Sequence, residues 1–357
     1  MTRVMTNRRG KIFIHKLFHW EYWPFQVVYI PIYFLWIFYS IKAKSLFFFN
    51  ASNPTIKNGG FIMESKKAIY DLIPQQYYPK TELIIEGTPL EKIQKLIQDS
   101  DIKYPLIAKP DIGLRGSAVK KIHNHEELES YSNKASFDFV VQDLIPFEKE
   151  VGIFYVRYPP DASGEKTGKI TGIVSKEFLI ITGDGFSTIE ELIKRNPRYE
   201  LQLKTLQIEY GKKLLNILPK GEKLNLVPFG NHARGAKFID RSHWISPQLT
   251  ETFNEMCLQI PGFYFGRLDV MYNTWEELEI GKNFAVVELN GAASEPTHIY
   301  DPKHSLFYAW KELARHITYM YEISVENHKK GIPYLAHKVG MKEYKLHLEQ
   351  SKKIINF

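Results

Sequence analysis

Two apolar segments that carry polar residues at alternate positions constrain the fold more than any other feature of this sequence. They read GRLDVMY (residues 266–272) and AVVELNG (residues 285–291). Successive side chains of a β-strand point to opposite faces, so Arg267 and Asp269 share one face of the first segment. By the same rule Glu288 and Asn290 share one face of the second segment, while Leu289 points toward a core. We therefore expect two strands, each buried on one face and polar on the other.

If these strands are antiparallel neighbours, the oxygen-bearing side chains of Asp269, Glu288 and Asn290 converge. Burying two carboxylates together costs several kcal/mol unless cations accompany them. Oxygen ligands of this kind suit a hard cation such as Mg²⁺, or Mn²⁺ in its place, with phosphates and water completing the coordination. Arg267 on the same face is placed to bind a transferring phosphoryl group. The alternative is a purely structural network of charged side chains.

A second candidate site lies in IAKPDIGLRGSAVKKI, residues 107–122. A predicted strand carries Lys109 and leads into a loop that is punctuated by glycine. Glycines allow backbone N–H groups to approach phosphate oxygens, and a lysine supplies positive charge. The loop residues that we expect to contact phosphate are Gly113, Arg115, Gly116 and Ser117. The spacing does not match a Walker loop, and an ordinary hairpin loop is the alternative.

A third candidate is the crossover between two predicted strands in VVQDLIPFEKEVGIFYV, residues 140–156. Such a crossover can offer backbone groups to the edge of an adenine and a carboxylate to ribose hydroxyls. The residues concerned are Gln142, Asp143, Leu144 and Ile145 at the end of the first strand, and Glu150 at the start of the second. A solvated turn is the alternative.

Composition narrows the class of protein and of partner. The 357 residues are enough for two or three subdomains, and the formal net charge of +7 suits an anionic ligand or an anionic membrane surface. That charge is modest for a nucleic-acid-binding protein, and we expect no nucleic acid among the partners. The single cysteine, Cys257, excludes an intrachain disulfide and a cysteine zinc cluster, and its apolar surroundings predict an inert core residue.

The N-terminal segment is basic, aromatic and apolar. Residues 25–41 carry no formal charge, are interrupted by Pro31, and are at the short limit for a membrane-spanning helix. Basic residues before the segment would keep the N-terminus inside, so a single span would place the rest of the chain outside. That location is untenable if the candidate phosphate- and adenine-binding segments use an intracellular nucleotide. We therefore favour a helix lying in the membrane interface, or a re-entrant hairpin broken at Pro31, with membrane contact through residues 17–50. The alternative is an aromatic helix that packs on the protein body or on a dimer partner; a homo-oligomer stays open.

The remaining sequence predicts an α+β chain rather than a regular βαβ alternation. Helical periodicity is seen in LEKIQKLIQDS, HEELESYS, STIEELIKR, LQLKTLQIEYGKKLLNIL, QLTETFNEMCLQI and HSLFYAWKELARHITYMYEIS. Strands are predicted in YPLIAKP, FDFVVQDLI, VGIFYVRY and KITGIVSKEFLIIT, in addition to the two polar-faced strands. The charged tail is expected to be helical or frayed.

Taken in order, these motifs resemble the ATP-grasp superfamily of ligases over roughly residues 61–325. GRLDVM and VELNG are similar to D-alanine–D-alanine ligases, and GDGFSTIEELI and FGNHARGAKF resemble segments of cyanophycin-synthetase-type members. The resemblance implies an ATP-grasp fold in which two α+β subdomains grip ATP, with residues 100–145 as the flap. It also implies an early phosphate-contacting lysine, Lys66 or Lys67, of which we favour Lys66.

The same resemblance assigns further roles. Arg234 would join Arg267 and Lys109 in stabilising the transferring phosphate, and Asn231 and His232 would line the acceptor site. The loop SEPTHIYDP departs from the pattern of D-alanine ligases, so Glu295 and His298 would contact a different acceptor.

The chain also departs from the family at its N-terminus. Most members carry a complete α/β domain there, whereas residues 1–60 are short, aromatic and apolar. We expect this membrane-like segment to replace that domain, followed by a catalytic region at 61–325 and a charged tail at 326–357. D-alanine is therefore not the expected substrate.

The implied function is an ADP-forming carboxylate–amine ligase that uses ATP and Mg²⁺ and forms an acyl-phosphate intermediate. Its substrates would be a small carboxylate and an amine, amphiphilic or derived from amino acids, at the cytoplasmic face of the membrane. The alternatives are an ATP-grasp kinase of a small hydroxyl-bearing substrate and a non-catalytic, nucleotide-binding membrane scaffold.

Overall fold

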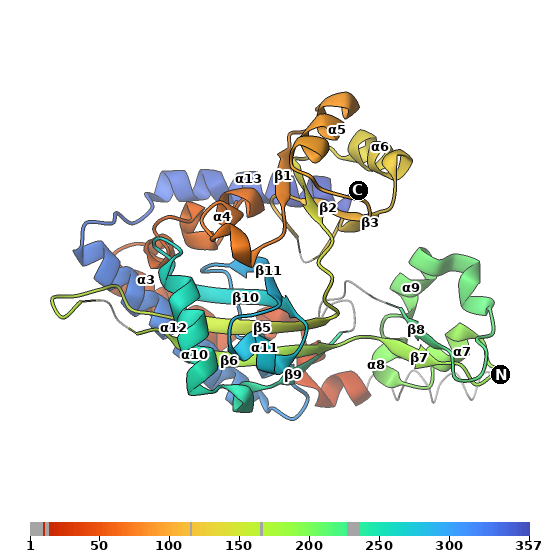
Figure 1. The fold of residues 1–357 in the computed structure, drawn as a ribbon. Coiled ribbons are helices and arrows are strands. Elements are labelled where there is room, and N and C mark those ends of the chain that lie inside the picture. Colours follow the sequence, from red (N-terminus) through yellow and green to blue (C-terminus); the bar gives the residue numbers. More distant parts are fainter. Residues whose placement is uncertain (1–9, 11–13, 115, 165–166, 227–235) are drawn as a thin grey trace. The chain divides into compact units, whose positions relative to one another are not determined.

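The computed structural model describes residues 10, 14–114, 116–164, 167–226 and 236–357. The chain forms a mixed α/β structure with antiparallel strand pairs and divides into two compact units (Figure 1). One unit comprises residues 1–31, 176–239 and 299–310, and the other comprises residues 32–175, 240–298 and 311–357. We call the second one the large unit. Strands β6 (Lys169–Glu177) and β9 (Lys237–Asp240) carry the chain from one unit into the other.

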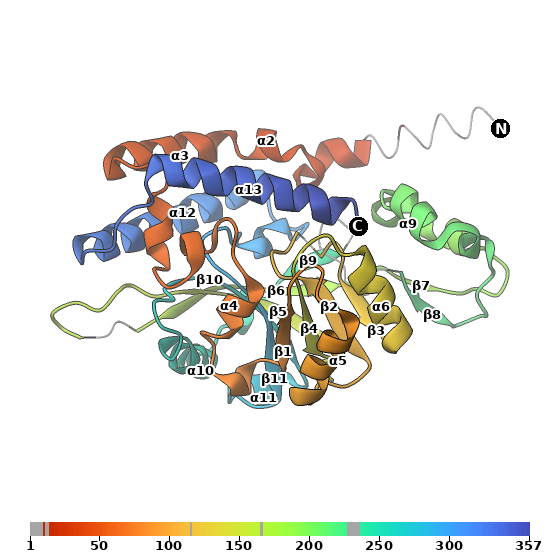
Figure 2. The same cartoon turned by 90° about the horizontal axis from the view of Figure 1, so that it is seen from above.

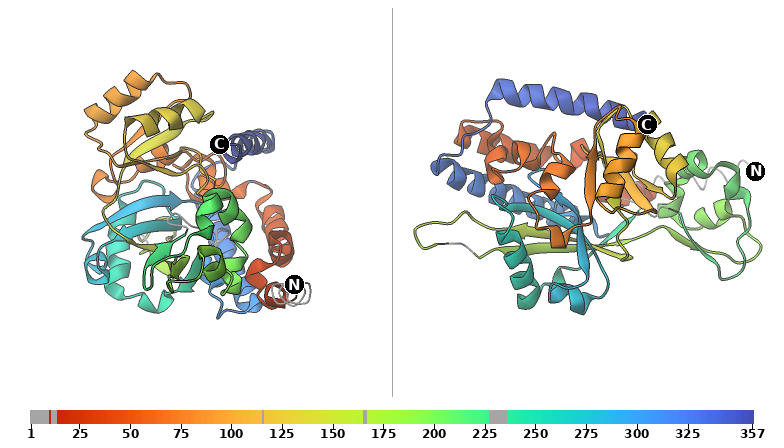
Figure 3. Two further views of the ribbon diagram at one scale, coloured as in Figure 1. Left: turned by 90° about the vertical axis from the view of Figure 1, so that its right-hand side faces the viewer. Right: turned by 45° about the horizontal axis from the view of Figure 1, so that its top comes forward.

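The first sheet of the large unit is built from residues 81–143. Its strands are β1 (Thr81–Ile84), β2 (Leu106–Pro110), β3 (Lys120–Ile122) and β4 (Phe139–Asp143), in the order β1-β4-β2-β3. Helices α5 (Leu90–Asp99) and α6 (His125–Lys134) pack on one face of this sheet through a core that includes Ile93 and Leu128 (Figure 3). Because side chains alternate along β2, Ala108 joins that core and Lys109 points to the opposite face.

The second sheet has the order β11-β10-β5-β6-β9, and its strands β5, β10 and β11 belong to the large unit. Its other strands are β5 (Lys149–Val156), β10 (Phe265–Tyr272) and β11 (Phe284–Asn290). Helix α10 (Pro247–Leu258) buries Phe253 and Cys257 against one face, which agrees with the predicted core role of this cysteine. Two short helices complete this region, α4 (Lys66–Tyr70) and α11 (Trp275–Glu279). The opposite face of β10 and β11 carries the polar residues.

Helix α3 (Ile30–Ala43) packs on the protein over one of its faces. Tyr39 is buried, stacks on Tyr321 at 4.2 Å between ring centroids, and its hydroxyl lies 2.8 Å from Thr318 Oγ1. Both partners belong to α12 (Leu306–Lys329), and Figure 2 shows α3, α12 and α13 along one side of the large unit. Within the part of the chain that the structure describes, no helix combines the length and the apolar character that crossing a bilayer requires. The packed-helix alternative therefore holds for one face of this segment.

The charged C-terminal segment forms α13 (His337–Ile355). Its last turn is anchored, because Ile354 is buried in the core of the first sheet and Phe357 contacts Tyr131 and Phe137. At its start Gly340 lies against Phe47, where an added Cβ would approach the ring to 2.6 Å.

The smaller unit contains the short helix α2 (Phe25–Val28) and a separate α/β cluster. The cluster comprises β7 (Ile180–Thr182), β8 (Lys223–Asn225), α7 (Ile189–Ile193), α8 (Pro197–Glu200) and α9 (Leu203–Tyr210). Thr188 caps α7 in a capping box with Glu191. The longer helix predicted over 201–218 is wrong, because α9 ends at Tyr210 where Gly211 adopts a φ of +51°.

Candidate active site

The two polar-faced strands are antiparallel neighbours. Asp269 lies opposite Glu288, and Arg267 lies opposite Asn290. Directly opposed residues of an antiparallel pair point to the same face, so these four side chains share one surface of the sheet. On the next strand Gly152 is opposite Asp269, and a Cβ on it would stand 3.0 Å from Asp269 Oδ1. The glycine therefore leaves room for the carboxylate.

Arg267 and Asp269 form a bidentate ion pair. Arg267 Nε donates to Asp269 Oδ1 at 2.8 Å and Nη2 donates to Oδ2 at 3.0 Å, and the Asp269 side chain is buried. Burial by itself lowers the pKa of Arg267, but the charge of Asp269 more than offsets this and raises it. The backbone N–H of Arg267 donates to Ser294 Oγ, and Nη1 donates to the Glu295 carbonyl at 3.4 Å. Arg267 thus contacts the loop that follows β11 through both its backbone and its guanidinium.

Lys66 neutralises Glu288. Its Nζ lies 2.6 Å from Glu288 Oε1 in a part-buried ion pair. Burial raises the pKa of Glu288, but the positive charges of Lys66, Lys109 and Arg267 outweigh burial and lower that pKa to about 2. The neighbouring Lys67 instead pairs with Asp71.

Glu64, which sequence reasoning missed, is a buried carboxylate beside this pair. Burial raises the pKa of Glu64 to about 7, against the opposing charge of Lys66. Its Oε2 atom is buried without a hydrogen-bond partner among the described residues. The sequence feature that could have identified Glu64 is its position two residues before Lys66 in ESKKAIY.

Lys109 is buried and its ammonium donates three hydrogen bonds. Its Nζ donates to Tyr70 Oη at 2.9 Å, to Gln142 Oε1 at 2.9 Å and to the Val287 carbonyl at 3.2 Å. That carbonyl is available because the β10–β11 register shifts after Asp269, which leaves Val287 as the extra residue of a bulge. Tyr70 also donates to Val287 O and was missed from the sequence; it stands one helical turn after Lys66.

The glycine-containing loop reaches the same cluster. An added Cβ on Gly113 would lie 2.5 Å from Lys66 Nζ and 4.0 Å from Glu288 Oε1. The loop begins at Asp111, whose side chain accepts from Lys67 N at 2.9 Å and from Ser65 Oγ at 3.0 Å. Further along, the Ser117 N–H donates to the Leu114 carbonyl, and Gly116 adopts a φ of +79°. Arg115 lies outside the described residues.

Only some of the predicted adenine-binding residues line a common pocket. A pocket of about 720 Å³ is lined by Asp143, Leu144 and Ile145, together with Lys67 and Tyr78. Gln142 does not line it; its side chain bridges Lys109 and Thr81 instead. Glu150 is opposite Met271 in the β5–β10 register and therefore on the face that carries Asp269.

The predicted acceptor residues separate into two groups. The first group, Asn231 and His232, lies outside the described residues, as does Arg234, which is predicted to stabilise the transferring phosphate. His298 is buried above Gly172, where an added Cβ would meet His298 Nδ1 at 2.3 Å, and its Nε2 lies 3.5 Å from Glu312 Oε2. Gly172 is opposite Phe154 in the β5–β6 register, and Phe154 is opposite Arg267 in the β5–β10 register. His298 therefore lies on the polar face, two strands from Arg267.

A buried polar network supports His298 from α12. Arg315 donates to Glu312 and to the Thr171 carbonyl. His316 Nδ1 lies 2.8 Å from the Glu312 carbonyl and Nε2 lies 2.9 Å from Thr171 Oγ1, which places the proton on Nδ1 and makes the hydroxyl the donor to Nε2. Burial lowers the pKa of His316 to about 3, so this ring is neutral.

The chemistry of the donor set fits a hard divalent cation. Asp269 and Glu288 are each neutralised by a protein cation, and the amide nitrogen of Asn290 is buried with no partner among the described residues. Over the same residues, no group of three His, Cys, Asp or Glu side chains is close enough to hold a metal by itself. Two carboxylates and an amide instead suit an ion that takes its remaining ligands from phosphates and water.

Comparisons with known proteins give a distant sequence relative. No protein-family model matches the chain. It is 24% identical over 277 residues to the glutathione biosynthesis bifunctional protein GshAB of Streptococcus mutans serotype c, a match that covers 69% of this chain and 35% of that protein. The chain therefore spans about a third of the length of this relative.

Solved structures align more loosely. A bifunctional glutathione synthetase from Pasteurella multocida aligns with a TM-score of 0.40 and 13% identity, over 73% of this chain and 36% of that one. A D-alanine–D-alanine ligase from Bacillus anthracis aligns with a TM-score of 0.40 and 14% identity, over 75% and 69%. The name of the sequence relative assigns it to glutathione biosynthesis. In its sequence and in the order of its motifs, this chain resembles the ATP-grasp ligases, which confirms the resemblance predicted from the motifs.

Proposed function

We propose that this chain is an ATP-grasp ligase that joins a carboxylate to an amine and releases ADP and phosphate. The observation that carries the proposal is one cluster of the large unit: Asp269 and Glu288 opposite each other, each with its own cation, beside Lys109 and Gly113. Four charged groups held this closely on one face of a sheet and at the start of a helix, against a glycine, are costly for stability alone and suit binding of a metal–nucleotide complex.

The proposed role of each residue in the cluster follows from its charge. Mg²⁺, held by Asp269, Glu288 and Asn290, would neutralise charge on the β- and γ-phosphates. Lys66 and Lys109 would bind phosphate oxygens, with Gly113, Gly116 and Ser117 closing over them, and Arg267 would stabilise the phosphoryl group in transfer. The pocket beside Asp143, Leu144 and Ile145 would take the adenine, with Gln142 and Glu150 nearby. The closed loop would also keep water from the intermediate.

Two bond changes make up the proposed reaction. An oxygen of the substrate carboxylate attacks the γ-phosphorus, and ADP leaves, which gives an acyl-phosphate. The amine nitrogen then attacks the acyl carbon, loses a proton, and displaces phosphate. Positioning and electrostatics account for the catalysis, and no protein nucleophile is required. Arg234, Asn231, His232, Glu295 and His298 would bind the transferring phosphate and the acceptor.

The decisive experiment measures ADP and phosphate release against pools of carboxylates and amines, including a lipid extract from the source cell. A ligase releases both in equal amounts with a new amide. A kinase would give ADP and a stable phosphorylated product without free phosphate. A nucleotide-binding scaffold would bind MgATP and never cleave it. Either of the last two outcomes contradicts the proposal.

The substrate class follows from the N-terminal segment. Apolar side chains remain exposed along α3, including Phe34 and Ile41, at 70% and 71%. We propose that the enzyme works peripherally at the cytoplasmic face of the membrane, where an amphiphilic carboxylate or amine is concentrated. In the screen, greater ADP release with lipid-extract substrates than with their water-soluble analogues would support this.

A further inference from the structure

Helix α3 leaves one apolar face uncovered within the large unit. Its outward residues are Tyr33, Phe34, Ile37, Phe38 and Ile41, with exposed fractions between 44% and 71%. Their spacing of one, three and four positions places them on a single helical stripe, which we call the α3 stripe. Soluble proteins rarely expose a contiguous patch of large apolar side chains unless that patch binds a partner.

The opposite face of α3 fixes the direction of the stripe. Trp36 lies against Phe48 and Phe49 at 5.1 and 5.6 Å between ring centroids, and Tyr39 is buried against α12. Rotating the helix to bury the stripe would expose these aromatic rings instead. The stripe is therefore a stable surface of this fold and faces away from the core.

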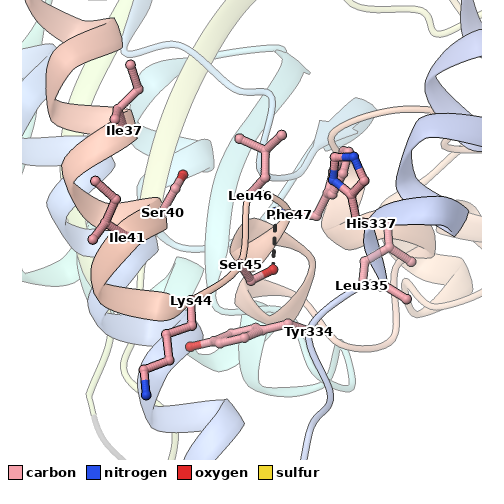
Figure 4. Close-up of a pocket in the computed structure, with 11 residues that line it drawn as sticks. Ile37, Ser40, Ile41, Lys44, Ser45, Leu46, Phe47, Tyr334, Leu335 and His337 are labelled. Atoms are coloured by element: carbon pink, nitrogen blue, oxygen red, sulfur yellow. Dashed lines mark hydrogen bonds between the residues drawn. The ribbon is translucent and has the colours of Figure 1, made fainter.

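A pocket continues the stripe at the C-terminal end of α3. It measures about 560 Å³ and is lined by Ile37 and Ile41 from the stripe, with Leu46 and Leu335 (Figure 4). Figure 4 shows Ile37 and Ile41 on one side of it and Leu335 and His337 on the other. Lys44 stands at its edge. An apolar pocket with a cation at its rim fits an alkyl chain that bears an anionic head group.

Lysines lie beside this apolar surface. Lys42 is in the last turn of α3 and Lys44 follows it, and Lys42 Nζ lies 5.2 Å from the centre of the Phe38 ring. Helix α13, which begins at the pocket with His337, carries the exposed lysines Lys338, Lys342 and Lys345 in its first half. It also exposes Met341, Tyr344 and Leu348. Apolar residues flanked by lysines are the composition of helices that lie on anionic bilayers.

We propose that the α3 stripe and the adjoining pocket dock the protein on an anionic lipid bilayer. The stripe enters the interface, Lys44 and the lysines of α13 bind anionic head groups, and one lipid chain enters the pocket. This deepens the proposed membrane location by naming the surface and the lipid class. It does not depend on the catalytic cluster, because none of its residues belongs to that cluster.

The test uses the full chain without nucleotide, sedimented with vesicles of phosphatidylcholine alone or mixed with phosphatidylglycerol. We expect binding to the mixed vesicles, weakening as salt increases. The double variant Phe34→Glu/Ile41→Glu should reduce binding at least about ten-fold, and Lys44→Glu should reduce it only for anionic vesicles. Ile85→Glu is the matched control, because Ile85 is 53% exposed in the same unit and lies off the stripe.

Separate readouts keep this test independent of catalysis. ATP binding by the stripe variants should be unchanged, so failure of the ligase proposal would leave the vesicle result intact. Equal binding of wild type and double variant to anionic vesicles would overturn the docking surface. A second result would also overturn it: no vesicle binding, together with a wild-type dimer in sedimentation velocity that is absent in the double variant. The stripe would then be an interface with a second copy of the chain.

Discussion

The ammonium of Lys66 at the start of α4 lies 2.6 Å from the carboxylate of Glu288 near the end of β11. This pair joins two segments 222 residues apart in the chain, and it places a cation directly on a predicted metal ligand. A divalent ion arriving with a nucleotide would therefore share Glu288 with Lys66, which couples phosphate binding to metal binding at one carboxylate.

The first prediction concerns that lysine. Lys66→Met should lower ADP release by about 10²- to 10³-fold, the loss typical for one electrostatic contact to a transition state. Lys67→Met is the matched control, because Lys67 is the next residue and pairs with Asp71. Steady-state ADP release at saturating MgATP measures both. Equal losses in the two variants would remove the distinction that the structure makes between these lysines.

The second prediction tests the metal ligands. Asp269→Asn and Glu288→Gln should each reduce ADP release at least about 10²-fold, since each removes a charge that the cation requires. Chelation with EDTA should abolish release in the wild type, and added Mg²⁺ or Mn²⁺ should restore it. Circular dichroism checks that both variants fold. Near-normal turnover in both folded variants would refute the metal assignment.

The third prediction uses the close approach of Gly113. In Gly113→Ala the new Cβ would stand 2.5 Å from Lys66 Nζ, the free end of a flexible side chain. The lysine can swing away at little cost in stability, but it would then leave Glu288. We expect a change of melting temperature of no more than a few degrees and a loss of ADP release of at least about ten-fold. A large fall in melting temperature with unchanged specific activity would contradict this geometry.

The fourth prediction is a pH dependence of stability. The pKa of His316 falls from its ordinary 6.5 to about 3 in the folded protein, because burial disfavours the charged ring. Between these values the unfolded chain binds the extra proton, so the free energy of unfolding should fall as pH decreases from about 6.5 toward 3. The full contribution is of the order of 5 kcal/mol.

The variant His316→Gln provides the comparison for this effect. It lacks the titrating group, although Glu312, Arg315 and His298 remain around the site. Its urea-unfolding free energy should be lower than that of the wild type at pH 7 and should fall less steeply between pH 6.5 and 4.5. Parallel curves for the two proteins over that range would show that His316 is not the group responsible.

The sequence alone determined the features that depend on local periodicity. Alternation along a strand placed Asp269 with Arg267 and Glu288 with Asn290, and the register of β10 and β11 agrees. The same alternation places Lys109 and Ala108 on opposite faces of β2. A capping residue and its glutamate set the start of α7. These follow from the chain's own geometry, because side-chain direction repeats every two residues in a strand and every 3.6 in a helix.

The tertiary structure alone decided which distant residues meet. No local pattern indicates that Lys66 contacts Glu288, that a bulge turns the Val287 carbonyl toward Lys109, or that Gly172 makes room for His298. The N-terminal segment shows the same limit. Its apolar character is visible in the sequence, but only the packing of Trp36 and Tyr39 decides which face is buried and which is left open. Burial is a property of the folded chain as a whole, so residue type by itself cannot assign it.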